Sequence, residues 1–205
     1  MAEFSFTGDI ILENEKVLLR PLRGEDFYLL LPFSLNEPEL WTYSLQPGNG
    51  PENLKSYIEK ALEGRENKNA YPFIVFDKTN NAVAGSTRFY DFQAVHNTVQ
   101  LGFTWYGKAF QGSGLNKNCK LLMFEFAFEK LELDRVEFRA DNNNLRSIAA
   151  MKSIGCKPEG VLRSNCASPT GRRDSIVLSI LKSEWHESVK QNLLQKIMLE
   201  SKITL

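Results

Sequence analysis

A turn with two glycines lies between a predicted strand and a predicted helix near the middle of the chain. The strand covers 98–105, the turn is Gln111-Gly112-Ser113-Gly114, and the helix extends from Leu115 to Lys130. A further strand over 135–140 follows the helix directly. A strand, a helix and a second strand in this order form a crossover, which leaves the two strands parallel in one sheet. We therefore expect an α/β fold built around this crossover.

The rest of the chain also alternates between predicted strands and predicted helices. Strands are expected at 16–22, 72–77, 82–89 and 175–180, the last preceded by a segment over 160–163 and a loop with Pro169 and Gly171. Helices are expected from 23–26 onward, from Glu52 onward, over 145–154 and over 183–205, with a loop at 36–51. Since the 205 residues contain no repeat or linker, we expect one domain, 1–205, with a core at about 16–185 and a C-terminal helix at 183–205.

The charges of the chain cancel, because 25 Lys and Arg residues are matched by 25 Asp and Glu residues. A nucleic-acid binder needs a positive field to collect phosphates, so we expect no nucleic-acid partner. The chain has no run of ~18 apolar residues, and its start lacks the layout of a signal peptide. We therefore expect a cytoplasmic protein with no membrane partner.

Histidine and cysteine are scarce in this sequence. The two histidines are His96 and His186, and the three cysteines are Cys119, Cys156 and Cys166. None of them form a close pair at metal-ligand spacing, so we expect no metal site and reduced, packed thiols. A histidine-based nucleophile system is not expected either.

The glycine turn has the chemistry of an anion site. Glycines allow the backbone to approach an anion closely, and the first N–H groups of a helix have no partner within that helix. A pyrophosphate would fit at this place, although a simple tight turn between strand and helix is the alternative. The turn lacks the Gly-Lys-Ser/Thr of a nucleoside-triphosphate loop and the third glycine of a Rossmann loop.

Several ordered motifs together resemble one known family. The first motif, Gln/Arg-x-x-Gly-x-Gly/Ala, follows a strand. After the next strand, the motif Asn-x-x-Ser begins a helix, and this helix ends in Gly followed by an apolar residue. The matching segments are 17–22, 101–103, 111–114, 135–139, 144–147, 154–156, 159–163 and 174–179, with Glu184-Trp185 after them. They resemble the GCN5-related N-acetyltransferase (GNAT) superfamily, and more narrowly its ribosomal-protein-alanine (RimJ/RimL) type. The resemblance extends from about Lys16 to Trp185.

The resemblance implies a fold and a co-substrate. The fold is a central mixed, mostly antiparallel sheet with splayed parallel strands and flanking helices, and acetyl-CoA lies in the opening between the two parallel strands. The residues implied for acetyl-CoA binding are Phe103, Thr104 and Trp105 for the pantetheine arm; Gln111, Gly112, Ser113, Gly114 and Leu115 for the pyrophosphate; and Asn144 for a hydrogen bond to pantetheine. The resemblance also implies Asn116 for acetyl-CoA binding. Asn116 stands where relatives have a small residue.

The implied reaction is attack of a primary amine on the thioester carbonyl while both substrates are bound. A base must remove a proton from the amine, and an acid must protonate the leaving sulfur. Many relatives use a tyrosine as the acid, but Met151 occupies that position here. In the RimJ/RimL type a serine that matches Ser147 takes this part. We therefore expect Ser147 to be catalytic and to lie in the CoA site, with an ordinary helix-start serine as the alternative.

The sequence does not single out one base. Gln100 stands where relatives often have a glutamate, and it cannot accept a proton at neutral pH. Glu137 on the neighbouring strand is the expected catalytic base if its side chain faces the site. Glu125 is expected on a helix surface, His96 has a suitable intrinsic pKa, and a bound water could serve equally well.

The acceptor amine is expected to lie among variable loops and aromatic residues. The candidates for lining this acceptor site are Trp41, Tyr43, Phe89, Tyr90 and Phe92, with a core role as the alternative. The predicted function is acetyl transfer from acetyl-CoA to a protein N-terminal α-amine or a small-molecule amine. A catalytically silent CoA-binding protein of the same fold and a generic anion-binding module remain as alternatives, and the chain is expected to be a monomer or a homodimer.

Overall fold

The computed structural model describes residues 4–169 and 171–203. The strands are β1 (Leu12–Glu13), β2 (Val17–Pro21), β3 (Ala70–Asp77), β4 (Ala82–Gln93), β5 (Thr98–Tyr106), β6 (Arg135–Asp141), β7 (Lys157–Ser168) and β8 (Gly171–Leu181). The helices are α1 (Phe27–Asn36), α2 (Pro51–Glu66), α3 (Leu115–Glu125), α4 (Leu145–Ser153), α5 (Lys182–Glu184) and α6 (Lys190–Ile203). Residues 204–205 of the expected C-terminal helix lie outside the described residues.

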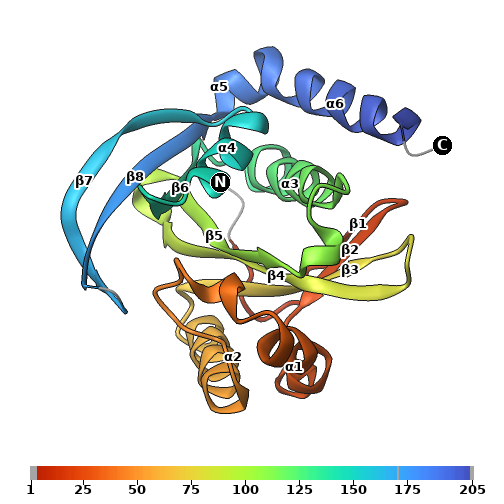
Figure 1. Cartoon of the computed structure of the whole chain (residues 1–205). Helices are drawn as coiled ribbons and strands as arrows, with labels where there is room; N and C mark the ends of the chain where they lie inside the picture. Colours follow the sequence, from red (N-terminus) through yellow and green to blue (C-terminus); the bar gives the residue numbers. More distant parts are fainter. Residues whose placement is uncertain (1–3, 170, 204–205) are drawn as a thin grey trace.

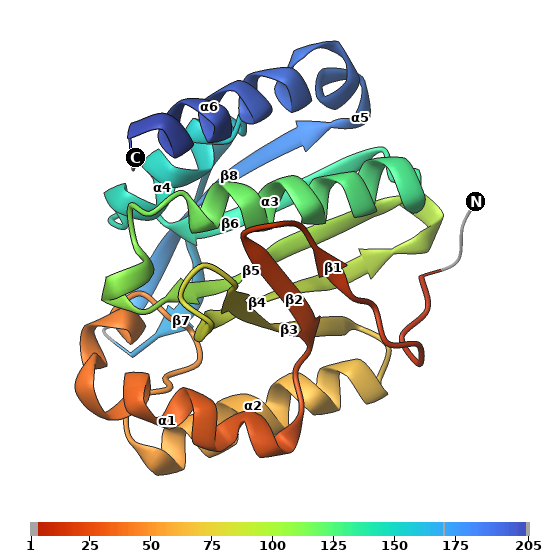
Figure 2. The ribbon, with the colours of Figure 1, turned by 90° about the vertical axis from the view of Figure 1, so that its right-hand side faces the viewer.

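The strands form one open sheet in the order β1-β2-β3-β4-β5-β6-β8-β7. Within the described residues, β5 and β6 are the one parallel pair, and the other neighbours run antiparallel. Helices α1 and α2 cover one face of the sheet, and α3, α4 and α6 lie on the other face (Figures 1 and 2). This mixed, mostly antiparallel sheet with flanking helices confirms the fold class expected from the sequence.

Two apolar clusters hold the helices on the sheet. On the α1 and α2 face, Leu30, Trp41, Tyr57 and Trp105 are buried together. On the opposite face, α3 contributes Phe124 to a larger cluster that includes much of the sheet. Each face of the sheet is therefore covered by helices with one apolar side, which is how such layers become stable.

The C-terminal segment packs back onto its own chain. Trp185 and Val189, on a π-helical turn over Trp185–Val189, and Leu193 on α6 are buried in the larger cluster. The Trp185 ring stacks on Phe128 with the ring centroids 5.7 Å apart, and its Nε1–H donates to Glu129 at 2.8 Å. The predicted apolar side of this helix thus has its partner within the chain.

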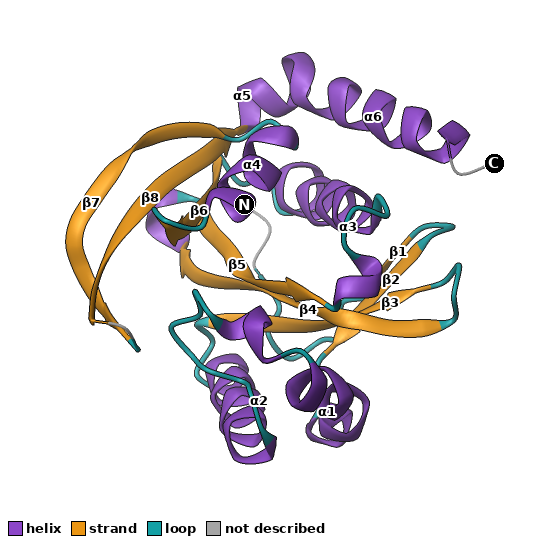
Figure 3. Cartoon of the chain, in the orientation of Figure 1, coloured by secondary structure: helices purple, strands orange, loops and turns teal. Residues whose placement is uncertain are grey.

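The largest difference from the prediction is strand β7, which has 12 residues where the sequence pattern indicates only 160–163. Nearly all of these residues are exposed, because β7 is an edge strand of the long curved β7–β8 hairpin (Figure 3). A strand that buries neither face lacks the alternation of apolar and polar residues by which strands are recognised. The predicted helix 115–130 ends differently too, since its last turn, Phe126–Lys130, is π-helical.

Candidate functional site

Strands β5 and β6 separate after a short paired stretch. They pair only from Thr98 to Gln100 on β5, opposite 135–137 on β6. From Leu101 to Tyr106, the edge of β5 that faces β6 is paired with no strand of the described residues. Its backbone N–H and C=O groups are therefore available to an extended ligand, which can add to a sheet edge as a strand does.

A β-bulge interrupts β5 in this parted stretch. Ser86 of β4 pairs with Trp105, and Arg88 pairs with Gly102, so that Phe103 and Thr104 together oppose Thr87. Phe103 has a φ of 49°, which is uncommon for a residue with a side chain. Bulges turn backbone groups away from the regular ladder and are frequent beside active sites.

The glycine turn leads from the end of β5 into α3. Gly114 is the N-cap of α3 with a φ of 80°, and Gly112 has a φ of 74°. A Cβ built on Gly112 would meet no atom within 4 Å, so the backbone there is open to a ligand. A Cβ on Gly114 would lie 3.0 Å from Oε2 of Glu200 on α6. The turn therefore offers free helix N–H groups and room for an anion, with one carboxylate close by.

Side-chain hydrogen bonds fix the turn and tie it to α4. The Ser113 hydroxyl donates to the Phe110 carbonyl at 2.7 Å, and Gln111 Nε2 donates to the Tyr106 carbonyl at 2.7 Å. Arg146, in the first turn of α4, donates to Gln111 Oε1. The start of α4 is thereby held beside the glycine turn.

The first turn of α4 carries the two remaining candidates. Asn144 is its N-cap, and Asn144 Oδ1 accepts from the Ser147 backbone N–H at 3.0 Å. This leaves the Asn144 amide NH₂ as a donor for a ligand. The Ser147 hydroxyl is half-buried and makes no hydrogen bond within the described residues. The structure therefore brings the bulge, the glycine turn with half-buried Asn116, and Asn144 with Ser147 to the same parted strands.

Glu137 lies in a different environment. Both of its carboxylate oxygens are engaged, one by Arg135 at 2.9 Å and one by Arg139 at 2.8 Å. The two guanidinium groups thus occupy the oxygens that would have to accept the proton of an amine. Because side chains alternate along a strand, Glu137 also faces away from Phe138 and the α3 side. This arrangement favours an ion-pair role, and we assign Glu137 no step below.

The other predicted acid and base positions offer no obvious proton carrier. Gln100 is buried and donates to Asp91 at 2.6 Å, and Met151 is a buried core residue. His96 is exposed in a 3₁₀ turn just before β5, at the opposite end of that strand from the bulge. Glu125 forms a surface ion pair with Lys190 at 3.0 Å, as expected for a helix-surface charge.

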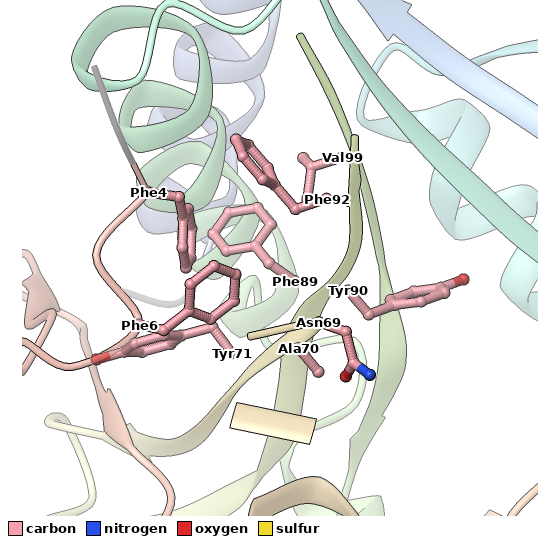
Figure 4. A pocket seen from close by; sticks show the side chains of 9 residues that line it. All are labelled: Phe4, Phe6, Asn69, Ala70, Tyr71, Phe89, Tyr90, Phe92 and Val99. Atoms are coloured by element: carbon pink, nitrogen blue, oxygen red, sulfur yellow. The ribbon is translucent and has the colours of Figure 1, made fainter. Parts of the chain in front are cut away.

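The aromatic residues predicted to line the acceptor site separate into two groups. Trp41 and Phe89 are core residues, 4% and 2% exposed, and Phe92 packs against the core beside Phe4 (Figure 4). These three residues take the core role that was the alternative, because Trp41 packs against Tyr57 of α2 and against Trp105, while Phe89 and Phe92 pack against Phe4 on the opposite face.

Tyr90 alone among the labelled aromatic residues of Figure 4 points to the other side of the sheet. Its ring lies 5.1 Å from that of Phe103 in the bulge, and burial raises the pKa of its hydroxyl to about 12. Tyr43 is 43% exposed. Tyr90 and Tyr43 are thus the two predicted aromatic residues that remain available for an acceptor.

Two buried cations beside the bulge were not singled out from the sequence. Lys120 on α3 and Arg88 on β4 are each 3% exposed. The sequence does indicate that Lys120 is buried, because Lys120 lies on the same side of the helix as Met123, Phe124 and Ala127, all of them buried. Arg88 stands in the middle of an inner strand, directly before Phe89, where a charge is equally unusual.

A groove on the surface of the molecule lies away from this site. A surface groove of about 470 Å³ lies near the N-terminal segment and the second half of α2, and no residue of β5, the glycine turn or α4 lines it. Among the described residues, no three His, Cys, Asp or Glu side chains are grouped as metal ligands would be. The helices in the described part of the chain are too short or too polar to cross a membrane.

Sequence comparison relates the chain to acetyltransferases. Residues 16–157 match the family model described as "Acetyltransferase (GNAT) domain". Over 177 residues the chain is 29% identical to the Bacillus subtilis (strain 168) protein named "Putative ribosomal N-acetyltransferase YdaF", a match that covers 84% of this chain and 94% of that protein.

Solved structures share the fold. One is described as a "putative acetyltransferase" from T. thermophilus, with a TM-score of 0.83, 31% identity, and coverage of 96% of this chain and 99% of that one. Another, also described as a "putative acetyltransferase", has a TM-score of 0.82, 32% identity and 94% coverage of both chains.

Proposed function

The chain belongs to the GNAT acetyltransferase family, and from this premise we propose that it transfers the acetyl group of acetyl-CoA to a primary amine while both substrates are bound. The observation that carries the proposal is the parting of β5 and β6 at the bulge, directly beside the glycine turn at the start of α3. Acetyl-CoA supplies the activated acyl group. An unpaired strand edge suits its amide-rich pantetheine arm, and free helix N–H groups suit its pyrophosphate.

The residues of this chain would hold the co-substrate at three places. The backbone of Phe103, Thr104 and Trp105 would pair with the pantetheine arm. The amides from Gly112 to Asn116 would bind the pyrophosphate, where the open position at Gly112 supports a close approach. The Gln111 N–H expected to take part already donates to the Lys108 carbonyl at 3.1 Å. The free amide NH₂ of Asn144 would donate to a pantetheine carbonyl. Holding two reactants in line can supply much of the rate on its own.

Ser147 is proposed as the acid that protonates the departing sulfur. Its hydroxyl is unengaged within the described residues, and its helix start is tied to the glycine turn through Arg146 and Gln111. We propose a bound water as the base, because Glu137 is engaged by two arginines and Gln100 cannot accept a proton. The acceptor proposed for the first screen is a protein N-terminal α-amine, since YdaF carries "ribosomal N-acetyltransferase" in its name.

The test is a titration of the protein with acetyl-CoA, CoA and ATP, followed by melting temperature. A ligand that binds only the folded state raises the melting temperature with its concentration. We expect both CoA species to shift the transition and ATP to leave it unchanged, and we expect the shift to be lost in Gly114→Val, where a side chain would stand in the turn. Stabilisation by ATP alone would contradict the proposal.

Catalysis itself is tested with Ser147→Ala. We expect its turnover number to fall by about 100-fold or more with little change in acetyl-CoA affinity, because the variant lacks only a proton donor. A turnover number equal to that of the wild type would remove Ser147 from the chemistry. The buried Met151 and Gln100 favour a second candidate, a silent CoA-binding protein, which binding of acetyl-CoA without acetylation of any screened amine would support.

A further inference from the structure

A buried lysine lies directly under the bulge of β5. The Lys120 ammonium donates to the hydroxyl of Thr104 at 2.9 Å and to that of Thr87 at 3.2 Å. The two hydroxyls are themselves 2.7 Å apart. Since Thr104 belongs to the bulge and Thr87 is the residue opposite it, the lysine connects α3 to the point where β5 leaves its regular ladder.

No described carboxylate pairs with this lysine. The titratable groups near it on the packed elements are the thiols of Cys119, on the same helix, and Cys156, just before β7. Burial raises the pKa of the Cys119 thiol to about 11 and that of Cys156 well above its usual range, so both thiols are neutral at pH 7. Burial lowers the pKa of Lys120 to about 8, which leaves its ammonium mostly charged at pH 7.

A second buried cation lies on the opposite face of the same bulge. The Arg88 guanidinium lies 4.0 Å from the centre of the Phe103 ring and 4.9 Å from that of Tyr57. Its Nε and one terminal nitrogen are buried and have no hydrogen-bond partner among the described residues. Because side chains alternate along β4, Thr87 and Arg88 point to opposite faces of the sheet. On the Arg88 face, the Glu137 carboxylate is already paired with two other arginines.

Buried cations without a counter-charge are unfavourable unless an anion comes to them. Aromatic faces and hydroxyl dipoles compensate only in part. Two such cations converge here on one bulge from opposite faces. The arrangement creates a positive potential at the strand edge that pantetheine would occupy, and it would be stabilised by negative charge at that edge.

We propose that Arg88 and Lys120 stabilise negative charge on the sulfur of CoA at the bulge. The inference rests on the proposed function. In acetyl transfer, the amine nitrogen bonds to the carbonyl carbon, and the carbon–sulfur bond breaks with its electron pair on sulfur. The amine gives up its proton to water, Ser147 gives its hydroxyl proton to the sulfur, and the serine regains a proton from water. Both cations act through the bulge, Lys120 by way of Thr104 and Arg88 by way of Phe103, so they are positioning residues.

The two cations explain how the chain can lack the tyrosine acid and the glutamate base that relatives have. A positive potential favours the ionised form of the departing thiol, which reduces the need for a strong acid where Met151 stands. The same potential favours the neutral form of an incoming amine over its ammonium, which reduces the need for a carboxylate where Gln100 stands.

The experiment measures the affinities of free CoA and of acetyl-CoA by calorimetry across a pH series, without any acceptor. Acetyl-CoA has no ionisable thiol, so the ratio of the two affinities isolates the ionisation of the bound CoA sulfur. We expect the ratio of the affinity for CoA to the affinity for acetyl-CoA to rise with pH. The rise should be about tenfold for each unit by which the site lowers the pKa of the thiol. Above about pH 8 the ratio should fall back in part, because Lys120 itself loses its proton there.

Four variants and a control complete the design. In Lys120→Met and Arg88→Met the rise in the ratio should shrink or vanish, and in Lys120→Arg and Arg88→Lys it should persist in part. Lys130→Met removes one exposed charge from the π-helical turn after α3 and should keep the wild-type curve. Acetyl-CoA binding by each variant shows that it has folded.

The outcomes separate the two proposals. A pH-dependent ratio in the wild type that both methionine variants abolish supports the inference. A flat ratio in a wild type that binds both ligands overturns this inference alone, as does an equal rise in the methionine variants. Absence of binding for both ligands overturns the proposed function, and this inference with it.

Discussion

Replacing Glu200 by Gln should strengthen the binding of acetyl-CoA, because the Glu200 carboxylate lies against the glycine turn. Its Oε2 is 3.0 Å from the place that a Cβ on Gly114 would take, and its Oε1 accepts from the Lys117 ammonium. A pyrophosphate bound by the first amides of α3 would bring negative charge to the same place. The carboxylate would then repel the ligand, and the glutamine would not.

The size of the effect follows from charge and exposure. Two unit charges 4 Å apart interact by about 1 kcal/mol in water and by about 4 kcal/mol at an effective dielectric constant of 20. The Glu200 side chain is 38% exposed, so the smaller figure applies. The variant also releases Lys117 to face the phosphates. We therefore expect a gain of about 1 kcal/mol, which is about fivefold in the dissociation constant.

The assay is a calorimetric titration with acetyl-CoA at about 0.05 M and about 1 M salt, because salt screens such a repulsion. Glu187→Gln removes an exposed carboxylate from the same C-terminal segment and serves as the control. We expect the gain only in Glu200→Gln and only at low salt. Unchanged or weaker binding, or a gain that high salt does not reduce, would refute the electrostatic reasoning.

Two further predictions concern stability. Asp26→Asn should lower the unfolding free energy by about 3 kcal/mol in urea titrations. The 1% exposed Asp26 carboxylate accepts two hydrogen bonds from Arg20, and the variant leaves this guanidinium without its charged partner. A loss no larger than that of the exposed control Glu25→Gln would contradict this. Arg135 holds the pKa of Glu159 at about 2, below its ordinary value of 4.5, so the stabilisation is present above about pH 4 and is lost as the pH falls through about 2. Urea midpoints measured down this range should fall more steeply in the wild type than in Arg135→Met, and equal slopes would argue against the pair.

The sequence predicts those parts of the fold and site that depend on neighbouring residues. The crossover from β5 through α3 to β6, the glycine turn and the capped start of α4 all follow from short patterns. The parting of β5 and β6 and the bulge at Phe103 depend on the register between strands, which no local pattern contains. The proximity of Asn144 to the turn likewise depends on the contact between Arg146 and Gln111.

Burial was the property that local patterns predicted least well. Trp41 stands in a segment rich in Pro and Gly and was a candidate for lining the acceptor site, with a core role as the alternative, and it is buried. A Cβ on Gly48 would lie 2.6 Å from its ring, so the loop closes over the indole because that residue is a glycine. Arg88 and Lys120 present the converse case, since charged residues are read as surface residues until the structure shows what covers them.

The short ladder between β5 and β6 has a consequence for local opening of the sheet. Within the described residues it consists of three residue pairs, and beyond it the two halves of the sheet are joined by the larger apolar cluster under α3. Backbone groups outside a ladder open most easily in native-state hydrogen exchange. The amides of β5 that face β6 beyond Gln100 are thus expected to exchange faster than those of the β3–β4 ladder in the free protein. A ligand that lay along this edge would accept hydrogen bonds from them, and their exchange would then slow.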